Sequence, residues 1–354
     1  MSSESECLSI HLSLTMPCFQ PAPELYSFMM HYLHLITTPV YIITLVALFK
    51  ETSQLFQKYK YYLIVHIITN FLSEGYVSFM WLPRTHLPYD VYKSTGILAH
   101  LNFSGVFQFL LLAQFLAFTG VSILEMFHYR FKAVVLYQSG KFYTNLPTLG
   151  IYLFRFLIVM HLLVFIWSMV DGQTIVYQKN KMDELFQKFP DLPAEIRCYT
   201  VFILAPEDPT LILSVILWGV LCTIGTVVVL TSVMLINQFL NKTKNLSKET
   251  KKLQKMLVIS LLAQAAIHVV MILFPVFVQI YQMIFILYNN DFVTVLLFCV
   301  AYHGFLSTCA MIIFTKQIRL KVLLMLRRLM KPKAVMIGPH QFGGQFAYVE
   351  SFHG

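Results

Sequence analysis

The sequence predicts an all-α membrane protein, a bundle of seven transmembrane helices with its N-terminus outside. Three observations predict this fold. Of the 354 residues, 57% are hydrophobic and only 12% are charged, whereas a soluble domain is about 25% charged. The charges are gathered between long apolar stretches. Each stretch has the roughly 20 residues that a helix needs to cross a hydrocarbon core. This composition excludes a soluble globule and a disordered chain, and the length of the stretches excludes the short alternating strands of a membrane β-barrel.

The spans are expected after an external N-terminal segment, 1–24. Within the spans only Glu74 and Arg155 carry a full charge. The last two spans come from one apolar run, Met256–Thr315, which is about three times as long as a bilayer core is thick. This run must therefore fold back, and Tyr288–Asp291 is the expected turn. The seven predicted spans are 25–49, 61–82, 97–124, 147–170, 210–240, 256–281 and 293–315.

The orientation follows from Lys and Arg, which are enriched in cytoplasmic loops. Nineteen of the 26 Lys and Arg residues lie in segments that alternate with the predicted external ones, and six lie in the external set. This distribution predicts an external N-terminus and a cytoplasmic C-terminus. The net charge of +9 is then mostly a consequence of topology, and we expect no nucleic-acid partner. The basic segments are 50–60, 127–146, 241–255 and 316–354.

Two segments outside the spans have features of their own. The external segment 171–209 carries charges of both signs, four prolines and a helix-like run, Met182–Phe189. A loop of this length is either a lid over the bundle mouth or a solvated connector. Basic and apolar residues alternate in 316–333, which predicts an amphipathic juxtamembrane helix on the anionic inner leaflet. We expect 334–354 to be a flexible cytoplasmic tail.

The cysteines do not form a disulfide framework, because half of them fall within predicted spans. Those on the expected external, oxidising side are Cys7, Cys18 and Cys198. Spacing alone leaves two readings open, one bridge such as Cys18–Cys198 or a free Cys198.

Polar side chains inside the spans are the candidate functional residues, because polar groups are costly in hydrocarbon and usually face the bundle interior. His66, Asn70 and Glu74 are spaced by four residues and so share one helix face. Glu74 must be paired, hydrated or protonated at this depth. Gln264 and His268 share a face of the sixth span. The expected ligand-binding residues are Asn70, Glu74, Asn102, Gln264, His268 and His303, and further polar groups in the third and fourth spans are His100, Gln108, Gln114 and His161. For each of them, hydrogen bonding from helix to helix is the alternative reading.

Enzyme signatures are absent from the sequence. It contains no G-x-S-x-G, no H-E-x-x-H and no Gly-rich phosphate loop with Lys. The seventh span has no lysine before Lys316, so a Schiff-base pigment is not expected. His31 and His34 are one helical turn apart but have no third ligand beside them. We expect no enzymatic activity, no cofactor and no metal site.

Three runs of residues are similar to those of a known family. Ser122–Arg130 (SILEMFHYR) ends the third helix, and Leu246–Lys255 (LSKETKKLQK) opens the sixth, which continues to Gln264 and Pro275. His303–Met311 (HGFLSTCAM) lies in the seventh. These runs resemble nematode serpentine chemoreceptors, class H within the Str-type group, and the likeness covers residues from about 30 to 320.

Two departures from the family pattern lie at the predicted cytoplasmic face. The run Lys316–Arg319 (KQIR) keeps only the Arg of a Pro-Tyr-Arg-like turn, and His128–Arg130 (HYR) stands where an Asn-Arg pair is usual. Both departures concern residues that would couple the receptor to its partner.

The resemblance implies a G-protein-coupled chemosensory receptor in the plasma membrane, in the ciliary membrane of chemosensory neurons. A small odorant or soluble chemical would bind within the helix bundle, and the sixth helix would move at Pro275. A heterotrimeric G protein would dock on Arg130, Lys251, Lys252 and Arg319, although topology alone also requires basic residues there. A seven-helix ligand-gated channel and a small-molecule transporter are the alternative functions. The ligand and the oligomeric state stay open.

Overall fold

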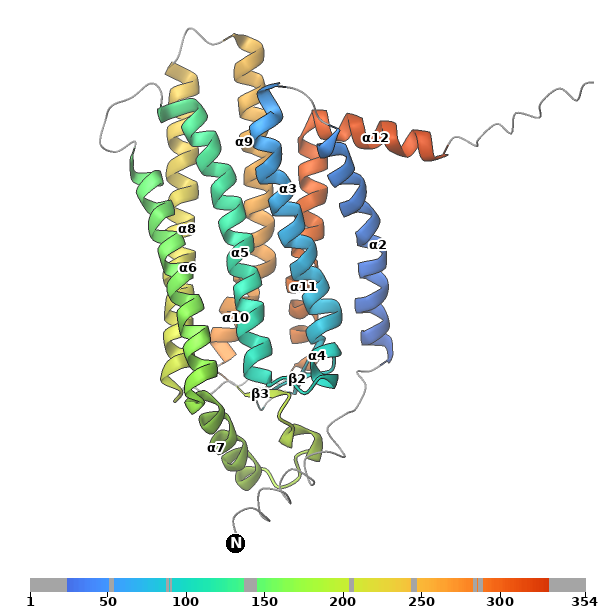
Figure 1. Ribbon diagram of the computed structural model, residues 1–354, viewed down its shortest axis with the longest axis vertical. Helices are drawn as coiled ribbons and strands as arrows, with labels where there is room; N and C mark the ends of the chain where they lie inside the picture. Colours follow the sequence, from blue (N-terminus) through green and yellow to red (C-terminus); the bar gives the residue numbers. More distant parts are fainter. Residues whose placement is uncertain are drawn as a thin grey trace, which may run out of the picture.

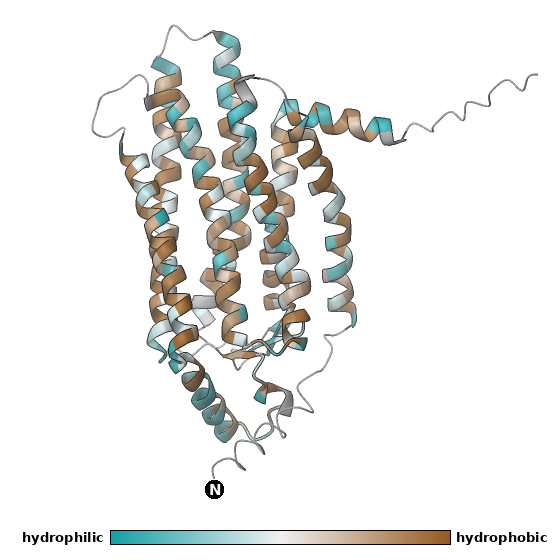
Figure 2. Ribbon diagram, in the orientation of Figure 1, coloured by the Kyte–Doolittle hydropathy of each residue, from teal (hydrophilic) through white to brown (hydrophobic). Residues whose placement is uncertain are grey.

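The computed structural model describes residues 24–50, 54–86, 89, 91–136, 145–203, 207–242, 247–282, 285 and 289–330. Within these residues, seven helices are long and apolar enough to cross a membrane, which confirms the predicted fold class. They run side by side as one bundle (Figure 1). Hydrophobic residues cover the middle of the helices and hydrophilic residues gather near their ends (Figure 2). The spans are α2 (Glu24–Phe49), α3 (Gln54–Gly75), α5 (Gly105–Phe131), α6 (Leu146–Asp171), α8 (Pro209–Lys242), α9 (Lys248–His268) with α10 (Phe274–Gln282), and α11 (Asn290–Phe314).

Three of these spans contain a π-helical stretch, in which backbone hydrogen bonds join residues five apart instead of four and the turn is wider. The stretches are η1 (Tyr76–Trp81) after α3, η2 (Lys132–Leu136) after α5, and η5 (Val269–Leu273) between α9 and α10. Pro275 lies two residues after the end of η5 and has no N–H to donate to the preceding turn, so the wide turn before it accommodates the lost hydrogen bond. The sixth span therefore has a local irregularity where the sequence places its proline.

The third span differs from the prediction of one helix over 97–124. A short helix, α4 (Ile97–His100), is followed by a break, and α5 begins only at Gly105. Asn102 lies in this break with φ of 63°, and the Ser104 hydroxyl caps α5 by accepting from the Phe107 N–H at 3.2 Å. The prediction that Asn102 lies inside a helix is therefore wrong. A left-handed Asn and a Ser cap favour a turn over a continuous helix.

α5 continues past the predicted span end at residue 124 to Phe131, in agreement with the run Ser122–Arg130 that was expected to end the third helix. Glu125, which suggested the end of the apolar run, accepts a hydrogen bond from Arg155 Nε of α6 at 2.7 Å. Because each charge has its partner on the neighbouring helix, neither has to leave the bundle. Similarly, α9 starts at Lys248, before the predicted span 256–281, as expected for a run Leu246–Lys255 that opens the sixth helix. The Ser247 hydroxyl accepts from the Thr250 N–H at 3.1 Å.

A small sheet closes one end of the bundle, called here the strand end. It consists of the antiparallel strands β1 (Pro83–His86), β2 (Val91–Ser94) and β3 (Val201–Ile203), in the order β1-β2-β3. No strand was expected from the sequence. The sheet pairs two segments that are far apart in the chain, and such non-local pairing leaves little periodic signal in strands this short.

The segment 171–209 is folded over the strand end. Its helix α7 (Gln173–Lys188) is longer than the predicted run Met182–Phe189, and the short helix η4 (Ala194–Arg197) follows it. The Gln178 side-chain amide donates to the Ile203 carbonyl and accepts from the Ile203 N–H, both at 2.8 Å. β3 approaches α5 so closely that a Cβ on Gly105 would lie 2.3 Å from the Val201 carbonyl carbon. These contacts favour the lid over the solvated connector.

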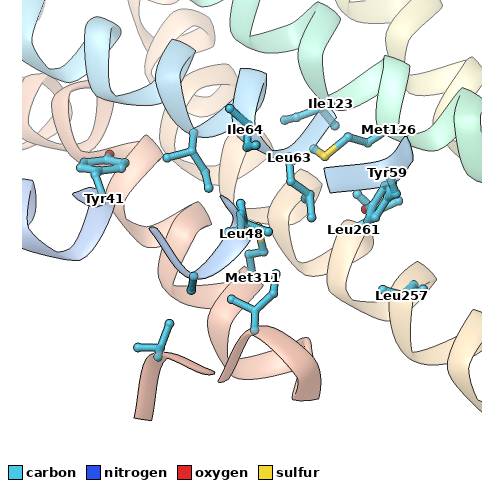
Figure 3. Packing of buried hydrophobic residues seen from close by; sticks show 14 of the residues in the cluster. Tyr41, Leu48, Tyr59, Leu63, Ile64, Ile123, Met126, Leu257, Leu261 and Met311 are labelled. Atoms are coloured by element: carbon cyan, nitrogen blue, oxygen red, sulfur yellow. The ribbon is translucent and has the colours of Figure 1, made fainter. Parts of the chain in front are cut away.

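The opposite end, called here the α12 end, carries the largest cluster of buried apolar residues (Figure 3). This cluster joins α2, α3, α5, α9 and α11, and the amphipathic helix α12 (Lys316–Met330) lies across it with Ile318 and Val322 buried. The Lys321 ammonium donates to the Lys50 carbonyl at the end of α2, at 2.9 Å. The labelled members in Figure 3 are Tyr41, Leu48, Tyr59, Leu63, Ile64, Ile123, Met126, Leu257, Leu261 and Met311.

Candidate functional site

Glu74 connects α3 to α2 through hydrogen bonds. Its side chain is fully buried, and one carboxylate oxygen accepts a hydrogen bond from the Tyr41 hydroxyl at 2.7 Å. The other oxygen accepts from the Thr37 hydroxyl and lies 3.1 Å from His34 Nδ1. Three donors from one helix thus satisfy the carboxylate, which answers the requirement that a charge at this depth be paired. Glu74 is held inside the wall between two helices.

His66, His268 and His303 come together from α3, α9 and α11. The ring centroids of His66 and His268 lie 5.6 Å apart, and those of His268 and His303 lie 5.1 Å apart. His66 Nε2 accepts from the Asn70 amide at 3.1 Å and from the Ser307 hydroxyl at 3.2 Å. Since Nε2 accepts, Nδ1 carries the proton and donates to Ser122 Oγ of α5 at 2.7 Å. We call His66, Asn70, His268, His303 and Ser307 the histidine cluster.

The histidine cluster contains acceptors that no described residue satisfies. His268 Nδ1 donates to the Gln264 carbonyl at 2.8 Å, and His303 Nδ1 donates to the Val300 carbonyl at 2.6 Å. In both rings the lone pair is therefore on Nε2, which has no hydrogen-bond partner among the described residues. The Asn70 and Gln264 side-chain oxygens are also unpartnered there. No group of three or more His, Cys, Asp and Glu side chains among the described residues is arranged to hold a metal ion.

The main cavity lies elsewhere, between α5, α8, α10 and α11 at the strand end. Its volume is about 680 Å³, within the range of small-molecule sites. Val227 and Phe277 line it and are 47% and 59% exposed, so the cavity reaches the outer surface of the bundle. None of the six predicted ligand-binding residues lines it. Its lining is mainly aliphatic and aromatic and includes Trp81, Leu112, Leu116, Trp218, Leu296 and Leu297.

The lid covers the strand end of this cavity. Tyr92 of β2 and Phe109 of α5 are part of the lining, and Phe109 stacks on Phe202 of β3 with ring centroids 4.2 Å apart. Phe202 is fully buried. The segment after α6 that contains β3 therefore contributes to the closure of the cavity through a pair of stacked rings.

The exposed side of the lid carries a small ion-pair network. The Lys181 ammonium donates to Glu184 at 3.1 Å and to Glu207 at 3.0 Å, linking α7 to the residues that precede α8. The hydrogen bond from Lys181 lowers the pKa of the Glu207 carboxyl. The pair therefore persists to a lower pH than an isolated Glu would allow and weakens as the pH falls through this lowered pKa. Because the groups are largely exposed, its contribution to stability is small.

The cavity and the histidine cluster are neighbours along two helices. Val300 lines the cavity, and its carbonyl accepts the hydrogen bond from His303 one turn further along α11. Leu273 lines the cavity at the end of η5, and His268 directly precedes η5. A molecule in the cavity would therefore press on the two elements that position His268 and His303.

Arg130 lies buried near the α12 end rather than on the surface. Its side chain stacks on the Tyr59 ring of α3, with the guanidinium carbon 3.6 Å from the ring centroid, and only 3% of the residue is exposed. Its Nε and one terminal nitrogen have no hydrogen-bond partner among the described residues. Arg130 is therefore buried in this conformation, and its role in docking stays a prediction.

The other predicted docking residues lie at the surface of the α12 end. Lys251 and Lys252 line a groove of about 580 Å³ formed by four lysines of α9 together with Met256, Ile259 and Phe314. Arg319 is exposed, and its guanidinium donates to the Ile313 carbonyl at the end of α11, at 2.7 Å. The lysines surround an apolar floor, a combination suited to an amphipathic partner.

The remaining predicted residues lie away from these sites. Asn102 is exposed in the turn before α5. Cys198 is disulfide-bonded. Cys18 lies outside the described residues, so the Cys18–Cys198 pairing stays a prediction. The tail 334–354 and most of segment 1–24 also lie outside the described residues.

The apolar cavity and its lining were not predicted from the sequence. The predicted site residues were polar, and an apolar residue of a span has the same sequence pattern whether it faces lipid, the core or a cavity. The aromatic residues Trp81, Phe109 and Trp218 are the one available signal, since large rings on several helices often line a small-molecule site.

Comparisons with known proteins address the identity of the chain. The family model described as "Serpentine type 7TM GPCR chemoreceptor Srh" matches residues 21–328. Neither a curated protein nor a solved structure matches the chain. The family match covers all seven spans and α12 except its last residues, and it agrees with the class H resemblance. The chain belongs to the Srh family of serpentine seven-transmembrane GPCR chemoreceptors.

Proposed function

We propose that this receptor binds a small, largely apolar chemical in the cavity between α5, α8, α10 and α11. Binding there changes the helix arrangement and signals to a heterotrimeric G protein at the α12 end. The observation that carries the proposal is the apolar cavity of about 680 Å³ beneath the lid. In an odorant receptor, an apolar ligand gains binding free energy when its surface is buried in such a cavity.

The signal would pass from the cavity to the histidine cluster. A ligand that contacts Val300 and Leu273 displaces the carbonyl that His303 binds and the π-helical stretch that follows His268. Several acceptors of the cluster lack a hydrogen-bond partner, which raises the free energy of the present arrangement. A second arrangement of similar free energy is therefore accessible. In this proposal Gln264, His268, His303 and Asn70 respond to the ligand without contacting it, and Glu74 anchors α3 to α2.

The G protein would dock on the lysine groove of α9 with Arg319 beside it. Lys251 and Lys252 lie in the groove, and Arg130 is one helix away under Tyr59. Movement of α9 at η5 would open the core shown in Figure 3, where Leu257 and Leu261 pack, and would release Arg130 toward the partner. Docking by Arg130 is thus conditional on activation.

We further propose that the strand end is external and the α12 end is cytoplasmic, as the distribution of Lys and Arg indicates. The receptor would then reside in the plasma membrane of chemosensory cilia. The oxidising external side also fits the disulfide-bonded Cys198, for which we propose Cys18 as the partner. Surface staining of an N-terminal epitope tag tests the topology, and staining only after permeabilisation would contradict it.

The function is tested by expressing the receptor with a promiscuous G protein and screening volatile and soluble chemicals by intracellular calcium. Once one agonist is found, Ala113→Phe should raise its half-maximal concentration at least tenfold, because the new ring fills the cavity that Ala113 lines. The matched control is Ile216→Phe, which adds a ring to the lipid-facing side of α8, where Ile216 is 56% exposed and does not line the cavity.

The competing functions give different results in the same cells. A current that persists without any G protein would identify a ligand-gated channel, and accumulation of the labelled agonist inside the cells would identify a transporter. Equal effects of Ala113→Phe and Ile216→Phe at equal surface expression would place the ligand outside this cavity.

A further inference from the structure

The polar groups along the cavity wall of α8 are not equivalent. Thr223 and Thr226 line the cavity, but their hydroxyls donate to the carbonyls of Gly219 and Cys222 within α8, at 2.9 and 2.8 Å. These two hydroxyl protons are therefore already used by the helix. Ser214, one of the other polar residues of the lining, differs from them.

The Ser214 hydroxyl is held by a chain of hydrogen bonds that spans three helices. The Gln114 amide of α5 donates to His161 Nδ1 of α6 at 2.5 Å, so His161 carries its proton on Nε2. His161 Nε2 then donates to Ser214 Oγ at 2.8 Å. Ser214 Oγ thus acts as an acceptor toward His161, and no carbonyl among the described residues accepts its own O–H. The hydroxyl proton is free to donate to a molecule in the cavity.

A second unused donor lies one helical turn away on the same face of α8. Trp218 also lines the cavity, and its indole Nε1–H is buried without a hydrogen-bond partner among the described residues. The ring lies edge-on to His161, with centroids 6.3 Å apart. Residues at positions i and i+4 of a helix are neighbours, so Ser214 and Trp218 present a pair of donors in an otherwise apolar wall.

We propose that the cavity selects a ligand with an apolar body and one hydrogen-bond acceptor, such as a carbonyl or ether oxygen, that is bound by Ser214 and Trp218. This inference rests on the proposed function and specifies its ligand class. A ligand that lacks the acceptor leaves both donors unpaired in the cavity, and an unpaired buried donor is costly. His161 and Gln114 are positioning residues, because they fix the direction in which the Ser214 proton points.

The test measures direct binding of octanal, which carries an acceptor, and octane, which carries none. The chain has three tryptophans, of which Trp81 and Trp218 line the cavity. Trp167 is 63% exposed on the outside of the bundle. In a Trp167→Phe receptor in nanodiscs, tryptophan fluorescence therefore reports on the cavity. Both probes are titrated as mole fractions of the lipid, which corrects for their partitioning into it.

Octanal should bind about tenfold more tightly than octane, the expected effect of one to two net hydrogen bonds. Ser214→Ala should weaken octanal binding about fivefold and should not weaken octane binding. Trp218→Phe should act in the same direction, with Trp81 as the remaining reporter. The matched control is Thr223→Val, which removes a hydroxyl that the helix already uses and should change neither affinity.

The outcomes distinguish a wrong ligand class from a wrong location of the ligand site. Equal affinity for octanal and octane, both lowered by Ala113→Phe, would refute the acceptor preference but keep the cavity as a ligand site. An octanal preference that survives both Ser214→Ala and Trp218→Phe would also overturn the inference. If neither probe changes the fluorescence, the cavity does not take apolar guests, and the proposed function fails together with the inference.

Discussion

Gly304 of α11 lies at a close approach of α11 to α3, and replacing it with alanine should separate the two helices. A Cβ on Gly304 would lie 2.6 Å from Asn70 Cβ, 3.1 Å from Asn70 Cα and 3.0 Å from the Tyr41 hydroxyl oxygen. Two of these three atoms are a backbone atom and the Cβ attached to it, so no side-chain rotation removes the clash. Carbon atoms need about 3.5 Å, so α11 or α3 must shift by roughly 1 Å.

The expected cost follows from two opposing effects. Overpacking of a well-packed site costs about 1–3 kcal/mol, and alanine gains up to about 1 kcal/mol over glycine from its greater preference for helix. The balance should be a net loss of about 1–2 kcal/mol in stability. The shift would also stretch the contacts between His66 of α3 and Ser307 of α11, whose atoms lie 3.2 Å apart. We therefore expect altered basal signalling as well.

Thermal unfolding of the purified receptor in detergent measures the effect, with Gly219→Ala as the matched control. A Cβ on Gly219 of α8 meets nothing within 4 Å, so this variant should be as stable as the unsubstituted receptor or slightly more stable. Gly304→Ala should unfold at a clearly lower temperature. Equal unfolding temperatures for the two variants would refute the close packing of α11 on α3.

Three further predictions follow from single contacts. Glu74→Leu removes the acceptor of three buried donors and should cost about 3 kcal/mol of stability, with a smaller loss for Glu74→Gln; thermal unfolding in detergent measures both, and equal losses would contradict the pairing. Tyr59→Leu removes the ring that holds Arg130, a contact worth about 2 kcal/mol when desolvated, and should raise ligand-independent signalling. A baseline unchanged at equal surface expression would argue against release of Arg130. Gly105→Ala should push β3 off α5, since the new Cβ would meet backbone, and should speed limited proteolysis of the lid; unchanged cleavage would show that β3 is not held there.

The seven spans were predictable because a bilayer imposes a simple rule on sequence. Every span must be long and apolar, and charges are tolerated only where they are paired. The two charged residues within the predicted spans illustrate both the rule and its limit. Sequence analysis identified Glu74 and Arg155 as exceptions that need an explanation, but their partners, on α2 and at Glu125, are set by packing between helices.

The candidate site was less predictable than the fold. The six predicted ligand-binding residues lie at the contact with α2, in the histidine cluster and the adjoining Gln264, and in an exposed turn. None of them lines the cavity. Helical spacing correctly grouped His66 with Asn70 on one face, because that relation is local. It cannot say that His66 meets His268 and His303, since those contacts depend on how three helices are rotated about their axes.

By itself the sequence determined the class of protein, the number of spans and the amphipathic helix after the last one, because hydrophobicity and charge act on each segment separately. The tertiary structure decided which polar groups are paired, where the chain breaks before α5, and how β3 joins β2 over the bundle. It alone placed a cavity beside the two donors of α8, since a void is a property of several packed helices and has no counterpart in any one of them.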